Sequence, residues 1–446
     1  MVNKNLFEKG TISSSAPFPQ DRFFYFQADG YNYLFGRDSL SVVRLPDIAN
    51  KKSLENVSKL FSKLEKESEY ADRPSLRTIA LNLTNNCNFS CRYCFANNGN
   101  YGKPGLVMSF ATAKKAINLL FAEVERSNSS RAAIAFFGGE PLLAWEMIKK
   151  VVKYAKNKAP NGPNVKFLIT TNASMLTKER AFFMKENKFS VMVSIDGDKQ
   201  ANDLNRVDKK NQGTYDGVAK NISLANRIIP LTLRATITNN NLDLVKITRH
   251  FLGLGAKMIT LGLDNNNLES HSYKKIAEFY NDLSEMYYHD LCSGYFYEIT
   301  NFSQIFFQLL FKEKKISHCN AGLSYLGVAA DGSMYKCPRF TDMEGHQFAN
   351  IKDGKEVRNK IASFRQELRK DARFRNSHCR RCPFVFLCGG LCHYDLLQKG
   401  KNIYQVIPEQ CELRKRIYED VIKLYSRLPK DIKRKLFLTI TDLGDN

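Results

Sequence analysis

Three cysteines lie close together in the stretch TNNCNFSCRYCFA, at Cys87, Cys91 and Cys94, with the spacing C-x3-C-x2-C. Thiolates at such spacings bind zinc or iron–sulfur clusters, and both sites normally take four protein ligands. The next His or Cys after Cys94 is His250, which disfavours a zinc knuckle. Three thiolates on a cubane cluster leave one iron open to an external chelator, and a methionine-like amino and carboxylate pair would fit there.

A second group of cysteines occupies the C-terminal part of the chain. It follows the pattern C-x12-G-x4-C, then C-x2-C-x5-C-x3-C, and then one more cysteine after 18 residues; its members are Cys319, Cys337, Cys379, Cys382, Cys388, Cys392 and Cys411. A pair of zinc ribbons is the alternative to iron–sulfur clusters here. Cys292 stands alone, and we expect a small buried apolar side chain at that position.

Composition is that of a soluble globular protein, with 446 residues, 43% hydrophobic and 25% charged. The N-terminus MVNKNLFEKG lacks an apolar signal region, and no apolar run is long enough to span a membrane. We therefore expect a cytoplasmic protein, in which reduced cysteines serve metal binding or catalysis. The net charge of +22 favours an acidic partner such as a peptide, nucleic acid or anionic membrane, unless the basic residues are simply solvated.

The first 75 residues indicate a small separate unit. Aromatic and β-branched runs at 22–27, 31–35 and 40–45, with turn residues between them, predict a three-stranded meander. Ser53 is a suitable cap for a helix whose apolar residues share one face, namely Leu54, Val57, Leu60, Phe61 and Leu64. Residues 71–75 look like a linker.

From 77 to about 262 short apolar strands alternate with amphipathic helices such as 111–126 and 143–156. The strands are predicted at 78–83, 132–137, 165–170, 190–195, 231–237 and 257–262. This alternation predicts an α/β fold with a parallel sheet and right-handed crossovers. The chemistry of such sheets lies at the carboxyl ends of the strands, and the three-cysteine loop directly follows the first strand.

The remainder of the chain divides into three parts. Residues 266–318 are helical and aromatic, residues 319–412 combine short strands, glycine turns and cysteines, and the tail after Cys411 is predicted to be one basic amphipathic helix.

The three-cysteine loop, with Tyr93 before its last cysteine, resembles that of the radical S-adenosylmethionine (SAM) superfamily. Further motifs follow at predicted strand ends, in FFGGEPLL, TTN, SIDG and LRATIT. The resemblance implies a partial (β/α)6 barrel and SAM contacts from Tyr93, Gly138, Gly139, Glu140, Asn172, Ser194, Asp196, Arg206 and Arg234. Asn202 departs from the family pattern, which has a histidine there.

The second cysteine group resembles the seven-cysteine SPASM pattern, which carries two auxiliary [4Fe–4S] clusters. By that resemblance Cys379, Cys382, Cys388 and Cys411 hold an outer cluster, and Cys319, Cys337 and Cys392 hold an inner one with an open iron. Three [4Fe–4S] clusters and SAM are thus implied as cofactors, together with a reducing partner such as flavodoxin or ferredoxin.

SPASM relatives mostly modify peptides, and this chain most resembles maturases that form thioether cross-links in ribosomally made precursors. The implied units are a leader-recognition module, winged-helix-like, at 1–74, the barrel at 75–265, a helical bridge at 266–318, the SPASM domain at 319–412 and a basic helix at 413–446. A sulfatase-maturating enzyme that makes formylglycine is the main alternative, but those relatives carry Asp where Pro338 follows Cys337. A quinone-cofactor maturase, an iron–sulfur electron carrier and RNA modification are weaker alternatives.

Overall fold

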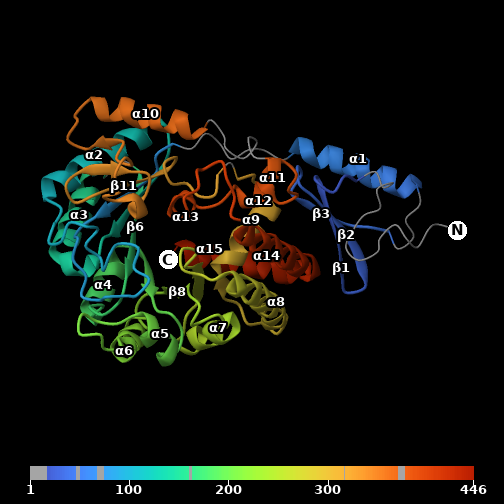
Figure 1. Cartoon of the computed structure of the whole chain (residues 1–446), viewed down its shortest axis with the longest axis horizontal. Coiled ribbons are helices and arrows are strands. Elements are labelled where there is room, and N and C mark those ends of the chain that lie inside the picture. The colour runs from blue at the N-terminus through green and yellow to red at the C-terminus, as the bar shows by residue number, and fades with distance from the viewer. Residues whose placement is uncertain are drawn as a thin grey trace.

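The computed structural model describes residues 18–46, 51–67, 75–159, 163–315, 317–369 and 377–445. They form an α/β body with a small separate sheet at one end (Figure 1). The large sheet has ten strands in the order β10-β9-β8-β7-β6-β5-β4-β11-β12-β13. The expected α/β class with a largely parallel sheet is confirmed. No helix in these ranges is long and apolar enough to cross a membrane.

Six parallel strands form the centre of the large sheet, and each lies within two residues of its predicted position. They are β4 (Thr78–Asn82), β5 (Arg131–Phe137), β6 (Asn164–Thr171), β7 (Phe189–Ser194), β8 (Leu231–Ile237) and β9 (Met258–Leu263). Their apolar side chains are covered by helices, as a parallel sheet requires.

The crossover helices lie on the outside of this sheet, at the left and bottom of Figure 1. They are α2 (Phe110–Arg126), α3 (Trp145–Lys158), α4 (Lys178–Glu186), α5 (Lys199–Asn205), α6 (Tyr215–Ala225) and α7 (Leu244–Gly253). The Ser109 side chain caps α2 by accepting from Thr112 N at 3.1 Å. The helix predicted from residue 143 begins later because Pro141–Ala144 forms a 3-10 turn.

The cysteine-rich segment continues the large sheet, which the sequence did not indicate. Strand β11 (Tyr325–Val328) pairs in parallel with β4, and β12 (Ser333–Tyr335) and β13 (Ala349–Asn350) follow in antiparallel order. At the other edge, β10 (Glu298–Ile299) pairs with β9. Strand β11, which lies between Cys319 and Cys337, is therefore hydrogen-bonded to the strand that precedes the first cysteine group.

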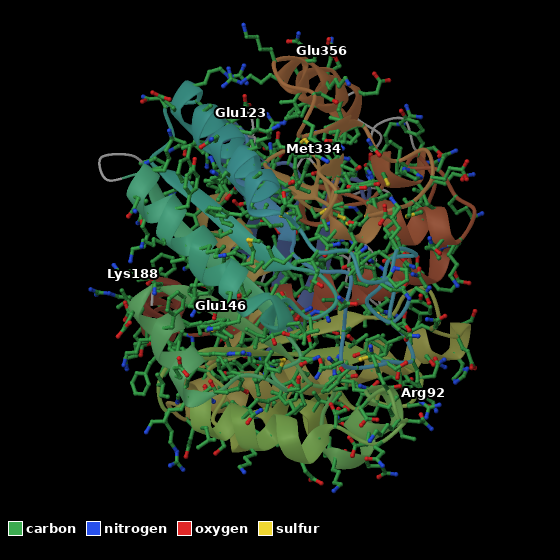
Figure 2. All side chains as sticks on the ribbon, turned by 90° about the vertical axis from the view of Figure 1, so that its left-hand side faces the viewer. Arg92, Glu123, Glu146, Lys188, Met334 and Glu356 are labelled. Atoms are coloured by element: carbon green, nitrogen blue, oxygen red, sulfur yellow. The ribbon has the colours of Figure 1, made fainter. Side chains whose placement is uncertain are left out.

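The remaining helices pack around this body. They are α8 (Ser270–Cys292), α9 (Thr300–Phe311), α10 (Glu356–Arg369), α11 (Ser377–Arg380), α12 (Val385–Cys388), α13 (His393–Gln398), α14 (Pro408–Arg427) and α15 (Lys430–Asp445). Figure 2 faces α2 and α3, with Glu123 labelled on α2; its carboxylate lies 2.7 Å from Arg126 and 3.8 Å from Arg365, which ties α10 to α2.

Two predictions for this part were wrong. The tail is two helices rather than one, because Leu428 adopts an extended conformation before Pro429. Cys292 is exposed rather than buried, because it ends α8 at the surface.

The N-terminal meander is confirmed as β1 (Phe23–Ala28), β2 (Tyr31–Gly36) and β3 (Ser41–Arg44), followed by α1 (Lys51–Glu67). Ser53 lies inside α1 and is not its cap, and Leu60 is exposed rather than part of the apolar face. The predicted linker lies outside the described residues except for Ser75. One face of the sheet packs on α1 through a small core that includes Tyr25, Leu34 and Phe61.

The other face of this small sheet packs against the C-terminal part of the chain, at the right of Figure 1. The ring of Phe384 lies 5.1 Å from that of Phe24 and 5.9 Å from that of Phe35. Arg427 at the end of α14 forms an ion pair of 3.0 Å with Asp29 in the β1–β2 turn. The alternation of side chains along a strand thus lets one sheet contact two layers.

Candidate active site

The three cysteines of the first group line one cavity of about 680 Å³ at the carboxyl ends of the parallel strands. Cys87, Cys91 and Cys94 belong to the loop between β4 and α2, and a turn hydrogen bond of 3.1 Å joins Cys94 N to Cys91 O. The predicted position of this loop at the active end of the sheet is confirmed.

Two of the three thiols, Cys87 and Cys91, lie in an environment that opposes their ionisation. Burial raises the pKa of Cys87 to about 12, with smaller contributions from Glu140 and the other two thiols. Burial also raises the pKa of Cys91. Phe89 N donates to Cys87 Sγ at 3.4 Å. A set of thiolates here would need a cationic partner, because like charges at low dielectric repel one another.

The Gly138–Gly139 turn lies directly against this loop. Gly139 N donates to Thr84 O at 2.9 Å, and Glu140 N donates to Asn86 O at 2.9 Å. A Cβ atom on Gly139 would lie 2.2 Å from Asn86 O, so the two backbones can approach this closely only with glycine. Both glycines and Glu140 line the cavity, as predicted.

Glu140 is almost fully buried, and its carboxylate joins the ends of two strands. It accepts from Leu142 N at 3.0 Å, from Thr171 Oγ1 at 2.7 Å and from Asn172 N at 2.7 Å. Burial raises its pKa although these three donors stabilise the charged form. Asn172 also reaches the first cysteine, with Nδ2 3.9 Å from Cys87 Sγ. Glu140 therefore fixes the main chain around the cavity.

Tyr93, Asp196 and Arg206 form one buried network. The Tyr93 hydroxyl donates to Asp196 Oδ2 at 2.7 Å and accepts from the Arg206 guanidinium at 2.5 Å, and Thr236 N donates to Asp196 Oδ1 at 2.9 Å. Burial raises the pKa of Asp196 despite the nearby Arg206. Tyr93 and Arg206 are among the described residues that line the cavity, whereas Asp196 is not.

Ser194 and Arg234 stand side by side on β7 and β8 and both line the cavity. Arg234 donates to Thr236 Oγ1 at 3.1 Å. A Cβ atom on Gly262 would lie 2.5 Å from the Arg234 guanidinium, so this glycine leaves room for the side chain.

The opposite wall comes from the second cysteine segment and was not identified from the sequence. Arg339 forms an ion pair of 2.7 Å with Asp395 and lies 3.5 Å from Cys392 Sγ. Its guanidinium stacks 4.1 Å from the ring of Tyr394 and 5.6 Å from that of Phe95, next to Cys94. One arginine thus contacts residues of both cysteine groups at the cavity wall.

Comparison with known proteins identifies the family. Residues 81–277 match the protein-family model of the radical SAM superfamily. An uncharacterized protein of Methanocaldococcus jannaschii is 30% identical over 289 residues, which cover 64% of this chain and 91% of that protein. The chain belongs to the radical SAM superfamily.

Characterised relatives of this radical SAM enzyme include a cysteine-type anaerobic sulfatase-maturating enzyme of Clostridium novyi, 27% identical and covering 71% of this chain and 88% of the relative. The radical SAM cyclopropyl synthase TigE of Paramaledivibacter caminithermalis is 24% identical, and the match covers 78% of this chain and 74% of TigE. The solved structure of anSMEcpe with bound AdoMet and Cp18Cys peptide has a TM-score of 0.68 at 22% identity, covering 81% and 99%. The structure of Streptococcus suis SuiB bound to precursor peptide SuiA has a TM-score of 0.52 at 15% sequence identity, and the match covers 87% of this chain and 98% of that one. These two structural likenesses show a shared fold.

The radical SAM family implies one [4Fe–4S] cluster and SAM, and the residues present fit both. Three half-buried thiols line a cavity large enough for a nucleoside ligand, and the raised pKa of Cys87 and Cys91 means that a bound cation would favour their thiolates. Cys87, Cys91 and Cys94 would hold the cluster. Within the described ranges, no three His, Cys, Asp or Glu side chains converge on a point as the ligands of a single metal ion do.

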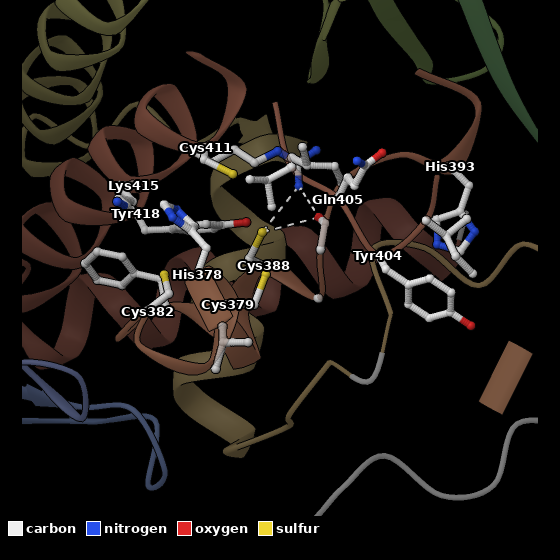
Figure 3. Close-up of a pocket in the computed structure, with 18 residues that line it drawn as sticks. His378, Cys379, Cys382, Cys388, His393, Tyr404, Gln405, Cys411, Lys415 and Tyr418 are labelled. Atoms are coloured by element: carbon white, nitrogen blue, oxygen red, sulfur yellow. Dashed lines mark hydrogen bonds between the residues drawn. The ribbon is translucent and has the colours of Figure 1, made fainter. Parts of the chain in front are cut away.

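Four cysteines of the radical SAM enzyme's second group surround a smaller pocket of about 60 Å³ (Figure 3). Burial raises the pKa of Cys382 to about 11 and that of Cys411 to about 12. Burial acts in the same direction on Cys388, which is half-buried, but Arg414, 3.5 Å from its Sγ, lowers its pKa. The structure brings these cysteines together with Cys379 as predicted, and Arg414 is an addition to the predicted residues.

The other three cysteines of this group interact with one another near Arg339. Burial raises the pKa of Cys337 to about 12, with added repulsion from Cys319 and Cys392. Lys336 lies beside all three and contacts the imidazole of His393. The seven cysteines thus lie in one set of four and one set of three, and their assignment to two clusters stays a prediction.

Proposed function

We propose that this radical SAM enzyme modifies a ribosomally made precursor peptide, most specifically by forming a thioether cross-link. The cavity lined both by the first cysteine group and by residues of the second cysteine segment is the observation that carries the proposal. One wall holds the first cysteines and the glycine turn, and the other holds Arg339 and Tyr394 from the second segment. A substrate in this cavity would lie between the two predicted cluster sites.

The residues of the first wall have separate tasks in this proposal. Cluster and SAM together supply a 5′-deoxyadenosyl radical, which takes a hydrogen atom from the substrate. Gly138, Gly139 and Glu140 would bind the SAM amino group, and Ser194 and Asp196 its carboxylate and ribose. Asn172, Tyr93, Arg206 and Arg234 would shape the remainder of the site, and Tyr93 hydrogen-bonds both Asp196 and Arg206. Holding SAM and substrate in contact distance is the main catalytic contribution of these side chains.

Two auxiliary [4Fe–4S] clusters complete the proposal. Cys379, Cys382, Cys388 and Cys411 would hold the outer one, and Cys319, Cys337 and Cys392 the inner one, whose fourth iron would be open. The Arg414 guanidinium would offset the charge of the outer set, and Arg339 that of the inner set. Anaerobic reconstitution should give about twelve irons per chain, and four or fewer would contradict the assignment.

The N-terminal sheet is proposed to bind the leader of the precursor. Strand β3 pairs with β2 alone among the described residues, so a peptide strand can extend the sheet at that edge. The SuiB structure, which shares the fold, contains its precursor peptide. A fluorescent leader peptide should bind the full chain and be displaced by unlabelled leader; displacement by the core segment instead would contradict this role.

Formylglycine formation is the second candidate, favoured by the sulfatase-maturating relatives. Pro338, which cannot act as a base, stands where those enzymes carry Asp. The test is mass spectrometry of peptides encoded by short reading frames beside the gene, incubated with the reconstituted enzyme, SAM and reduced flavodoxin or ferredoxin. A thioether loses two hydrogens and keeps sulfur, whereas formylglycine exchanges sulfur for oxygen. An unmodified peptide would contradict both.

A further inference from the structure

One carboxylate in the cavity has no part in the site described so far. Asp264 directly follows β9, at the same carboxyl edge as the other strand-end residues, and lines the cavity with Asn266 and Asn267. Its Oδ2 accepts from Asn267 Nδ2 at 2.8 Å. The main chain of Asn266 also interacts with this carboxylate, but among the described residues no side chain donates to Oδ1, which can therefore accept from a ligand.

The other acidic side chains around the cavity already form several hydrogen bonds or an ion pair. Glu140, the second carboxylate of the described lining, has three donors. Asp196 bonds the Tyr93 hydroxyl and a main-chain N–H. Asp395 pairs with Arg339 at 2.7 Å and accepts from an amide at 2.8 Å. Asp264 is therefore the carboxylate best placed to exchange a proton with a substrate.

Asp264 also lies on the appropriate side of the cavity. Arg339 and Asp395 are the charged groups that act on it, and Arg339 is 3.5 Å from Cys392 Sγ. Asp264 and Arg339 thus line the same cavity, and Arg339 in turn contacts Cys392 of the set formed by Cys319, Cys337 and Cys392. Burial raises the pKa of Asp264, which makes its carboxylate a stronger base than an exposed one.

We propose that Asp264 Oδ1 accepts the proton that a peptide thiol loses when the substrate is oxidised. The inference rests on the peptide-modifying function proposed above and supplies a base that Pro338 cannot provide. It holds for both candidate products, because the cysteine S–H bond is broken in each.

The atoms and electrons balance as follows for a thioether. A hydrogen atom leaves the substrate C–H bond for the 5′-deoxyadenosyl radical, giving 5′-deoxyadenosine. The carbon radical then bonds to the sulfur while the S–H proton goes to Asp264. One electron remains and passes to a one-electron acceptor of the iron–sulfur class, for which the three-cysteine set provides ligands beside Arg339.

The test compares Asp264→Asn and Asp264→Glu, with Asp282→Asn on the exposed face of α8 as the control for the same substitution. The probe is the synthetic precursor that the wild-type enzyme modifies, and the readout is modified peptide formed per 5′-deoxyadenosine. We expect this ratio to fall at least about 100-fold in Asp264→Asn, to recover in part in Asp264→Glu, and to stay unchanged in the control.

A pH series separates proton transfer from binding. In the wild type and in Asp264→Glu the ratio should fall at low pH, as the carboxyl becomes protonated, while Arg339 stays charged. Asp264→Asn should lack this low-pH limb and improve only as the free thiol ionises. A wild-type ratio in Asp264→Asn, or a raised KM with an unchanged ratio, would overturn the proposal. No modified peptide from the wild type would overturn the proposed function instead.

Discussion

Replacing Gly139 by alanine should damage the site more than any other single methyl group added to the chain. Its Cβ would lie 2.2 Å from Asn86 O and 2.8 Å from Gly99 O, both main-chain atoms that cannot rotate away. An ordinary C···O contact is about 3.3 Å, so the glycine turn and the cysteine loop must separate by about 1 Å. That shift strains the hydrogen bonds from Gly139 N and Glu140 N.

The magnitude follows from these contacts. Overpacking costs about 1–3 kcal/mol, and two weakened main-chain hydrogen bonds add about 1 kcal/mol each. Together these costs, about 3–5 kcal/mol, lower the free energy of unfolding. The displaced turn should also bind SAM roughly 100-fold more weakly, which is a loss of about 3 kcal/mol of binding free energy. Misplacing reacting groups by about 1 Å costs a further factor of about 100 in rate. Isothermal titration with SAM and chromatography of 5′-deoxyadenosine measure the two effects.

Gly217→Ala is the matched control. Gly217 lies in α6, where an added methyl group would meet no atom within 4 Å, and alanine favours a helix by about 1 kcal/mol. This variant should keep wild-type binding and rate. SAM affinity and 5′-deoxyadenosine formation within about threefold of wild type in Gly139→Ala would refute the close-approach argument.

Three further predictions concern buried polar groups. Tyr93→Phe removes a hydroxyl that lies between a carboxylate and a guanidinium, and it should lower the free energy of unfolding by about 1–3 kcal/mol. The control Tyr295→Phe changes an exposed residue and should have no such effect. Equal urea midpoints for the two variants would contradict this prediction. Burial raises the pKa of Asp420 from 3.8 to about 6, so folding favours its protonated form and stability is lost as pH rises between these values. Asp420→Asn should therefore stabilise the protein at pH 7, by up to about 3 kcal/mol, but not below pH 4. Asp282→Asn should have no effect at either pH, and a pH-independent effect of Asp420→Asn would exclude the linkage. Arg414→Met should slow alkylation of the four-cysteine set in metal-free protein, and an unchanged rate would show that the guanidinium does not favour the thiolate.

Residues that follow parallel strands could be placed from the sequence. Chain order alone brings the carboxyl ends of β4 to β9 to one edge, so Cys87, Gly139, Asn172 and Ser194 meet wherever the loops are short. Asp264 follows a strand in the same way, and the same reasoning would have identified it. The meander was predictable because its turns are local.

The second wall of the cavity could not be placed in that way. Arg339 reaches the cavity because β11 pairs with β4, a contact between segments far apart in the chain that no local pattern encodes. The inward turn of Asp196 depends on Tyr93 and Thr236, which come from two other elements. The exposure of Cys292 depends on how α8 packs, whereas the residue type alone predicts only the average burial of a cysteine.

The most direct test of the central claim follows a hydrogen atom from peptide to cofactor product. The reconstituted enzyme is incubated with SAM, a reductant and the candidate precursor carrying deuterium at its carbon-bound positions, and the 5′-deoxyadenosine is analysed by mass spectrometry. A peptide-modifying radical SAM enzyme should transfer one deuterium to 5′-deoxyadenosine, and a variant with Cys87, Cys91 and Cys94 replaced by alanine should form none. Unlabelled 5′-deoxyadenosine, formed at the same rate with and without peptide, would contradict the account.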